Sequence, residues 1–242
     1  MSSLVYAQSE LKRTFRNFRF FIFSLGFPLA LYFLIAGPNR HEKIGGIPLP
    51  LYFMTGMMAF GTMIAVVSSG GRIAAERQLG WNRQLRITPL RAPSYLGAKV
   101  ASGYAMAASS ILLISLAGTL IGVRLTAGEW ATLVALVLIG LIPFAAMGIA
   151  IGHLVSVDSL GPLMGGLTSI LALLGGAWGP IATSGALHTV SEAMPSYWLV
   201  EAGKTALGGS VWPLTGWLVI GVWSVAMTVL AAWAYRRDTA KA

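Results

Sequence analysis

Residues 130–152 read WATLVALVLIGLIPFAAMGIAIG and contain no charged side chain. A helix needs about 20 mainly apolar residues to cross the hydrocarbon core of a bilayer, which is about 30 Å thick. The run is long enough, and Trp130 stands at its edge, where aromatic rings settle at the level of the lipid headgroups. This stretch therefore predicts a transmembrane helix, and the rest of the chain extends the same pattern.

Composition places the whole chain among membrane proteins. Hydrophobic residues make up 56% of the 242 residues and charged residues only 10%, and the mean hydropathy is +0.73, all far from the averages of soluble domains. The absence of cysteine excludes a disulfide scaffold and a thiolate metal site. The formal net charge is +9, and because the bases flank apolar runs, this charge favours anionic lipid or an acidic protein over nucleic acid as a partner.

Uncharged runs of sufficient length occur throughout the chain. We expect an all-α integral membrane protein with six transmembrane helices, and we treat residues 1–242 as a single transmembrane domain. The six runs are 20–36, 50–71, 101–123, 130–152, 160–178 and 212–235.

The distribution of Lys and Arg predicts the orientation of these spans. Thirteen of the 17 lie before the first run, between the second and third runs, or after the last run. The four on the other side of the membrane are Arg40, Lys43, Arg124 and Lys204. Since cytosolic loops carry the excess of positive charge, we expect a multi-pass protein with both termini in the cytosol.

Two segments outside the spans also show helical patterns. The N-terminal segment predicts an amphipathic helix lying in the cytosolic interface, with an apolar face formed by Leu4, Leu11, Phe15, Phe18 and Ile22. A disordered basic tail is the alternative for this segment. The external segment 179–213 predicts short helices divided at Pro195, with Ser196 placed to cap a helix that stops at Gly208.

The predicted spans contain no ionisable side chain, which argues against ion-coupled transport and against catalysis within this chain. We expect no catalytic, cofactor-binding or metal-binding residues. His153 and Asp158 follow the fourth run, where we expect both to be solvated at the membrane interface. A membrane enzyme would require these two side chains to meet at a bound substrate.

The cytosolic loop after the second run is the most informative segment. Residues 73–99 read IAAERQLGWNRQLRITPLRAPSYLGAK. Within 73–88, one helical face carries Ala74, Gln78, Trp81 and Leu85, which predicts a short amphipathic helix with a bend at Gly80 and an end at Pro89. The alternative is a solvated loop that only obeys the charge rule for topology, with a local ion pair between Glu76 and Arg72 or Arg77.

The same loop resembles the cytosolic signature of the type-2 ATP-binding-cassette (ABC) permeases, which export drugs and polysaccharides. The matching residues are Glu76, Arg77, Gln78, Leu79, Gly80, Leu85, Thr88, Pro89, Leu90, Tyr95, Gly97 and Lys99. The order of the spans is similar too, as are Arg16-Asn17 before Phe27-Pro28 at the first span and Pro195-Ser196-Tyr197-Trp198 before the last. Gln78 stands where that family commonly has a second acid, and Trp81 where it usually has Thr.

The resemblance implies half of a membrane channel in the bacterial inner membrane. Its partners would be a second six-span chain, in a homodimer or a heterodimer, and cytosolic ABC ATPase subunits that bind ATP and Mg²⁺. The sequence contains no G-x-x-x-x-G-K-[ST] loop to hold phosphates, so hydrolysis belongs to another subunit. The residues expected to couple this chain to the ATPase are Glu76, Arg77, Gly80, Trp81, Leu85, Thr88 and Pro89.

These expectations lead to one main functional hypothesis and one alternative. An uncharged pathway suits an apolar or amphipathic cargo such as a drug, an antibiotic or a lipid, exported from the cytosol or the inner leaflet. The alternative is a membrane assembly or regulatory protein that recruits a cytosolic partner through its basic helix without transport. The sequence identifies no residue that contacts a substrate.

Overall fold

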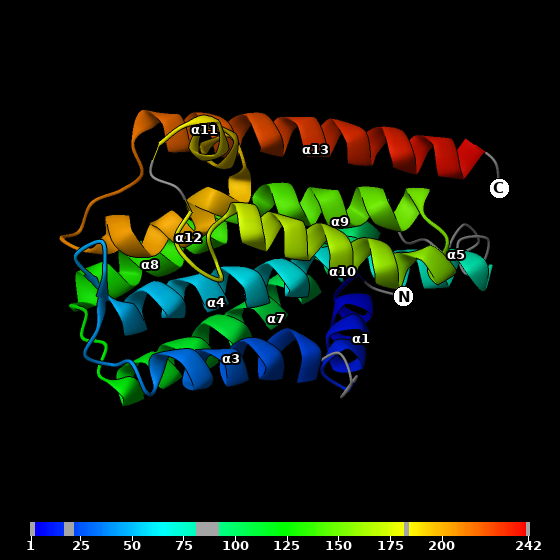
Figure 1. Ribbon diagram of the computed structural model, residues 1–242. Helices are drawn as coiled ribbons and strands as arrows, with labels where there is room; N and C mark the ends of the chain where they lie inside the picture. The colour runs from blue at the N-terminus through cyan, green and yellow to red at the C-terminus, as the bar shows by residue number, and fades with distance from the viewer. Residues whose placement is uncertain (1–2, 17–21, 81–91, 182–183, 241–242) are drawn as a thin grey trace.

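The structure, a computed structural model, describes residues 3–16, 22–80, 92–181 and 184–240. Its long helices lie side by side, and α1 crosses one end of the bundle (Figure 1). The helices are α1 (Ser3–Phe15), the π-helix η1 (Ile22–Gly26), α3 (Phe27–Ala36), α4 (Leu49–Val67), α5 (Gly71–Gln78), α7 (Ala92–Ile121), α8 (Ala127–Gly140), α9 (Ile142–Leu154), α10 (Val157–Leu174), α11 (Ala186–Glu192), α12 (Pro195–Ala206) and α13 (Leu214–Ala240). Besides these helices, β1 (Lys43–Ile44) and β2 (Ile47–Pro48) form a short antiparallel hairpin that the sequence analysis did not predict.

The described residues include five helical segments long and apolar enough to cross a membrane. They are Leu49–Gln78, Pro93–Ile121, Ala127–Leu154, Val157–Leu174 and Leu214–Thr239, and they correspond to the second to sixth predicted runs. The first predicted run, 20–36, contains only a shorter apolar helix, Ser24–Ala36, and its first two residues lie outside the described residues. A π-helical turn precedes Pro28, whose ring removes a backbone donor and interrupts regular helix geometry. The structure thus shows a helical membrane protein with five candidate spans, and a sixth crossing stays a prediction.

Two of the candidate spans extend well beyond the apolar runs. The helical segment that begins at Leu49 continues to Gln78, and α7 begins before the predicted start of its span at residue 101. The added turns carry Glu76 and Lys99, both buried. The predicted runs themselves hold no ionisable side chain, and these two helices continue past them because the charges of the added turns are paired inside the protein.

The basic residues gather at one end of the bundle. Figure 1 shows α1, α5 and the C-terminal end of α13 together at this end, and the hairpin with the α7–α8 and α12–α13 connections at the opposite end. We call the first the basic end, since Lys12, Arg13, Arg77, Lys99 and Arg236 belong to elements that meet there. The charge rule predicts that the basic end faces the cytosol.

Helix α4 is the centre of the fold and α13 lies at its edge. In the most apolar window of each span, 89% of the residues are buried for the α4 segment but only 17% for α13. Close packing around α4 depends on small residues in α9. A methyl group added to Gly148 would lie 2.7 Å from the Val67 carbonyl oxygen, and one added to Gly152 would collide with the carbonyl oxygen of Gly70. The G-x-x-x-G spacing of Gly148 and Gly152 therefore permits helix contact within one chain.

The N-terminal helix packs on the protein through a polar face. Tyr6, Glu10 and Thr14, spaced four residues apart, are buried, and α1 packs against α7. Val5 and Phe15 are exposed, as is Ile22 beyond the end of the helix. Of the predicted apolar face, Phe15 and Ile22 are exposed and Leu11 is half-buried, and the contact of this face with the membrane stays a prediction.

The external segment forms α11 and α12, and α12 packs into the bundle against α4 and α8. The predicted cap is wrong. Met194 is the N-cap residue and Pro195 occupies the first turn, because proline lacks the N–H that a cap would satisfy. The helix ends before Gly208 and Gly209, whose positive φ values of 80° and 73° reverse the chain direction.

Candidate functional site

The candidate site begins in α5, the part of the predicted coupling segment that the structure describes. A break at Ser68–Gly70 separates α5 from α4, yet the two helices form one continuous candidate span. Ile73, Ala74 and Glu76 are its buried residues. A displacement of α5 would therefore pass directly to α4, the most buried helix of the bundle.

Glu76 is the buried centre of a cluster of charges. Its Oε1 lies 2.6 Å from Lys99 Nζ and 3.4 Å from the Arg13 guanidinium, and its Oε2 accepts a hydrogen bond of 2.7 Å from the Tyr95 hydroxyl. The Glu76 side chain is only 4% exposed. The alternative of a solvated loop with a local ion pair does not hold for Glu76, since its carboxylate is buried and partners on α1 and α7 reach it instead.

Lys99 joins the acids of two separate helices. Its side chain is completely buried, and its Nζ lies 2.9 Å from Glu10 Oε1 on α1 as well as 2.6 Å from Glu76 on α5. The ammonium also sits 5.3 Å from the centroid of the Tyr95 ring. A buried cation is tolerated only when it is paired, and two carboxylates satisfy this requirement.

Arg72 supplies a second, half-buried cation to the cluster. Its Nε lies 3.3 Å from Glu10 Oε1, and its terminal nitrogens donate to Thr14 Oγ1 and, at 2.6 Å, to Ser102 Oγ. Two buried carboxylates thus face the buried Lys99 and the half-buried Arg72. We call Glu10, Arg72, Glu76, Tyr95 and Lys99 the charge cluster, which connects α1, α5 and α7.

Tyr6 borders the charge cluster without a hydrogen bond of its own. Its ring centroid lies 5.9 Å from that of Tyr95, and its buried hydroxyl has no partner among the described residues. Burial raises the pKa of Tyr6, and the negative charges of Glu76 and Glu10 raise it further, so this hydroxyl stays protonated.

A second group of charges connects α5 to α9 and α13. Arg77 Nε donates to Asp238 Oδ1 at 2.8 Å, and one of its terminal nitrogens donates to the Gly152 carbonyl oxygen at 3.1 Å. The other Asp238 oxygen lies 2.9 Å from His153 Nδ1. We call Arg77, His153 and Asp238 the Asp238 cluster.

This arrangement changes the interpretation of His153. The side chain is buried and paired with Asp238, so the expectation of a solvated histidine is wrong. Asp158 is exposed in the first turn of α10, as expected of an interfacial residue. The juxtaposition of His153 and Asp158 that a membrane enzyme would require is replaced by the pairing of His153 with Asp238.

The remaining residues of the predicted coupling segment divide into two groups. Gly80 has a φ of 71° and follows the end of α5, where glycine tolerates the left-handed conformation that terminates a helix. Helix α5 ends at Gln78, and the part of the predicted helix beyond Gly80 lies outside the described residues, so the bend at Gly80 stays a prediction. Trp81, Leu85, Thr88 and Pro89 lie outside the described residues.

The sequence analysis missed several members of the two clusters. It did not assign Glu10 or Asp238 a role, and it used Tyr95 and Lys99 only as points of resemblance. The spacing of Tyr6, Glu10 and Thr14 was the available signal for the α1 side, because it places polar groups on one helical face. Asp238 was the lone acid in a basic C-terminal tail.

Comparisons with known proteins place the chain in a family. The model of a family described as "ABC-2 type transporter" matches residues 3–207. A Bacillus subtilis (strain 168) protein named "Putative transport permease YvfS" is 29% identical over 192 residues, which cover 78% of each chain. No solved structure matches the chain significantly.

Proposed function

Because the chain belongs to the ABC-2 type transporter family as a membrane transport permease, we propose that it is the membrane subunit of an exporter driven by ATP. Hydrolysis takes place in separate ABC ATPase subunits, which bind ATP and Mg²⁺. The permease pairs with a second six-span chain in the bacterial inner membrane, and both of its termini face the cytosol.

The observation that carries this proposal is the pairing of α5 with distant helices. Glu76 binds Lys99 of α7, which in turn binds Glu10 of α1. Arg77, the next residue, binds Asp238 of α13. Adjacent charges on one short helix are thus connected to three other helices. A loop that served topology alone would need none of these contacts.

The contacts define a path for mechanical coupling. The segment from Gly80 through Trp81, Leu85, Thr88 and Pro89 docks on the ATPase, whose closure on ATP displaces α5 together with the coupling residues Glu76 and Arg77. Direct continuity transmits this displacement to α4, the charge cluster transmits it to α1 and α7, and the Asp238 cluster transmits it to α9 and α13. Ion pairs with defined geometry suit this role, because packed elements move as units between discrete arrangements.

The cargo we propose is apolar or amphipathic, such as a drug, an antibiotic or a lipid. The buried ion pairs described above lie at the basic end. The central helix α4 (Leu49–Val67) consists mainly of apolar and small residues. A pathway between such surfaces favours molecules that already partition into lipid.

The test uses the permease purified with its ATPase subunit and reconstituted in vesicles with a fluorescent amphipathic dye. The variant Asp238→Asn weakens the link from Arg77 to α13 without touching the docking segment. We expect ATP hydrolysis to persist while dye export per ATP falls about fivefold or more, the usual range for the loss of a coupling interaction. Glu201→Gln is the matched control, since its carboxylate pairs with Lys204 within α12, and it should export at the parental rate.

Three results would contradict the proposal. The permease alone, free of contaminating ATPase, could hydrolyse ATP. The parental complex could bind the ATPase yet export nothing, which would favour the assembly or regulatory alternative. Asp238→Asn, Trp81→Ala and Leu85→Ala could all export at the parental rate, which would remove α5 and its docking segment from the coupling path.

A further inference from the structure

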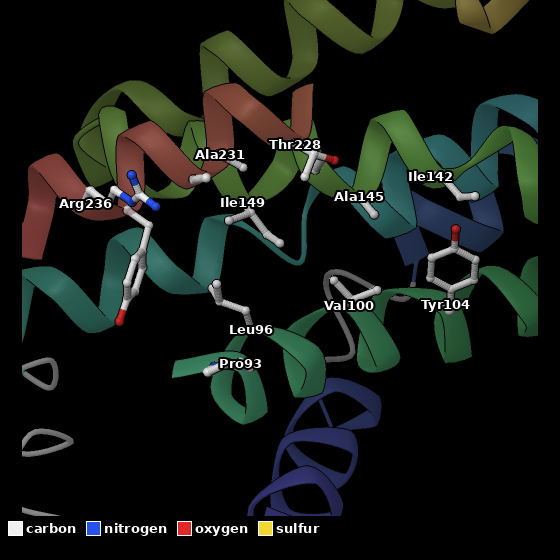
Figure 2. Close-up of a pocket in the computed structure, with 13 residues that line it drawn as sticks. Pro93, Leu96, Val100, Tyr104, Ile142, Ala145, Ile149, Thr228, Ala231 and Arg236 are labelled. Atoms are coloured by element: carbon white, nitrogen blue, oxygen red, sulfur yellow. The ribbon is translucent and has the colours of Figure 1, made fainter. Parts of the chain in front are cut away.

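A pocket of about 690 Å³ opens between α7, α9 and α13, beside the Asp238 cluster, since its lining residue Tyr235 packs against His153. Its walls are almost entirely apolar, and Leu96, Val100, Ile149 and Ala231 lie along them (Figure 2). Arg236 lies at one end of the pocket, and Tyr104 lies toward the other. The size is in the range of pockets that hold small organic ligands, roughly 300–1,000 Å³.

Small side chains keep this pocket open. Helix α9 packs against both α7 and α13, and Ala145 and Ala146 of α9 with Ala231 and Ala232 of α13 contribute to the lining. A methyl group is too short to fill the space between α7 and α13. The pocket is therefore an apolar slot, with α7 and α13 as its two sides and α9 beside them.

The surroundings of the slot are those of a lipid-facing surface. Its two flanking helices are candidate spans, and their exposed residues include Leu112 and Leu116 of α7 and Val222 and Val225 of α13. Apolar side chains exposed on a membrane span face hydrocarbon. The slot therefore opens toward the membrane, and an acyl chain suits its walls.

Arg236, at one end of the slot, further restricts the charge of the ligand that the slot can bind. Arg236 is exposed, lines the slot and forms no ion pair among the residues that the structure describes. The next residue, Arg237, is engaged elsewhere, with its guanidinium 5.3 Å from the centroid of the Trp233 ring. Arginine holds phosphate through several N–H donors, and bases at the membrane surface attract anionic headgroups.

We propose that the slot between α7, α9 and α13 binds an anionic glycerophospholipid. One acyl chain lies along Leu96, Val100, Ile149 and Ala231, and the phosphate meets the guanidinium of Arg236. Apolar walls alone would accept any acyl chain, whereas the adjacent unpaired cation selects lipids with net negative charge. The residues that line the slot belong to neither charge cluster, and this proposal does not depend on the cargo of the exporter.

Native mass spectrometry of the purified, delipidated protein tests the site with dioleoylphosphatidylglycerol and dioleoylphosphatidylcholine as probes. We expect about fivefold tighter binding of the anionic lipid, the contribution of one basic residue near the membrane surface. Arg236→Gln should abolish this preference. Arg237→Gln removes the same charge one position along the helix, outside the slot, and should retain it.

A second pair of variants tests the apolar walls. Ala232→Trp places a large ring in the slot and should weaken binding of both lipids. Ala226→Trp adds the same ring to an exposed position of α13 outside the slot and should leave binding unchanged. Because Arg236 is exposed, Arg236→Gln remains a valid test even if Ala232→Trp fails to fold.

The proposal is overturned if the parental protein binds both lipids equally, or if Arg236→Gln and Arg237→Gln behave alike. It is also overturned if Ala232→Trp removes a dimer but leaves lipid binding intact, which would make the slot an interface between two copies of the chain. Displacement of the bound lipid by an exported dye at equal affinity would instead assign the slot to cargo.

Discussion

The two ends of the bundle use ion pairs in different ways. At the basic end, Glu76 pairs with Lys99 and Arg13, which are 23 and 63 residues away in sequence. At the opposite end, Lys204 pairs with Glu201, three residues away on the same helix. The Lys99 side chain is fully buried, whereas that of Lys204 is 31% exposed. The basic end therefore joins separate helices through ion pairs, whereas the Lys204–Glu201 pair at the opposite end lies within one helix.

This difference has consequences for how each end responds to change. A pair removed from water is held by its partner, and loss of one member leaves an uncompensated buried charge. A partly exposed pair exchanges its partner for water at little cost. A perturbation of α5 is thus expected to reach several helices, while a perturbation of α12 charges stays where it occurs.

The largest expected effect comes from Lys99→Met, which keeps the length of the side chain and removes its charge. Glu10 and Glu76 would then lose their shared cation while still buried. The free energy of unfolding should fall by about 3–5 kcal/mol, measured by chemical denaturation in mixed micelles. Adding Glu76→Gln to Lys99→Met should recover part of this loss. A single variant as stable as the parent would show that water enters the charge cluster freely.

An intermediate effect is expected from Tyr95, whose hydroxyl donates a hydrogen bond, in comparison with the neighbouring Tyr6, whose hydroxyl has no partner among the described residues. Tyr95→Phe removes the hydrogen bond to Glu76 and should lower the free energy of unfolding by about 1–3 kcal/mol. Tyr6→Phe is the matched control, because its hydroxyl has no partner among the described residues, and it should be neutral or slightly stabilising. Equal losses for the two variants would contradict the hydrogen bonding of the charge cluster.

The smallest effect is expected from Lys204→Met at the opposite end. Its pair with Glu201 is partly exposed and local, so the free energy of unfolding should change by less than about 1 kcal/mol. The same denaturation series measures it beside Lys99→Met. A loss as large as that of Lys99→Met would mean that both ends depend on buried charge, and the contrast between them would disappear.

Much of the fold could be predicted from residue patterns. Apolar runs such as 130–152 predict spans because a membrane helix must cover its backbone with about 20 apolar side chains. The second to sixth runs correspond to candidate spans in the structure. The first run was harder, because Pro28 and the π-helical turn before it alter the local geometry. The end of the Leu49–Gln78 segment and the start of α7 were also missed, because buried and paired charged residues extend these helices beyond their apolar runs.

The candidate site could be predicted only in part from residue patterns. Glu76 and Arg77 stood out as charges in a patterned loop, but the pattern favoured partners within that loop. The real partners come from α1, α7 and α13. No local periodicity carries that information, since a helix shows which residues share a face and not which helix covers that face.

The sequence by itself determined the membrane environment, the helical class and the gathering of bases at one end, because these depend on composition and on the length of apolar runs. Only the tertiary structure decided which charges meet. Lys99 reaches Glu10, 89 residues away, because α1 and α7 pack at the basic end with both side chains directed inward. Burial then makes the pairing obligatory, since neither charge has water as an alternative partner.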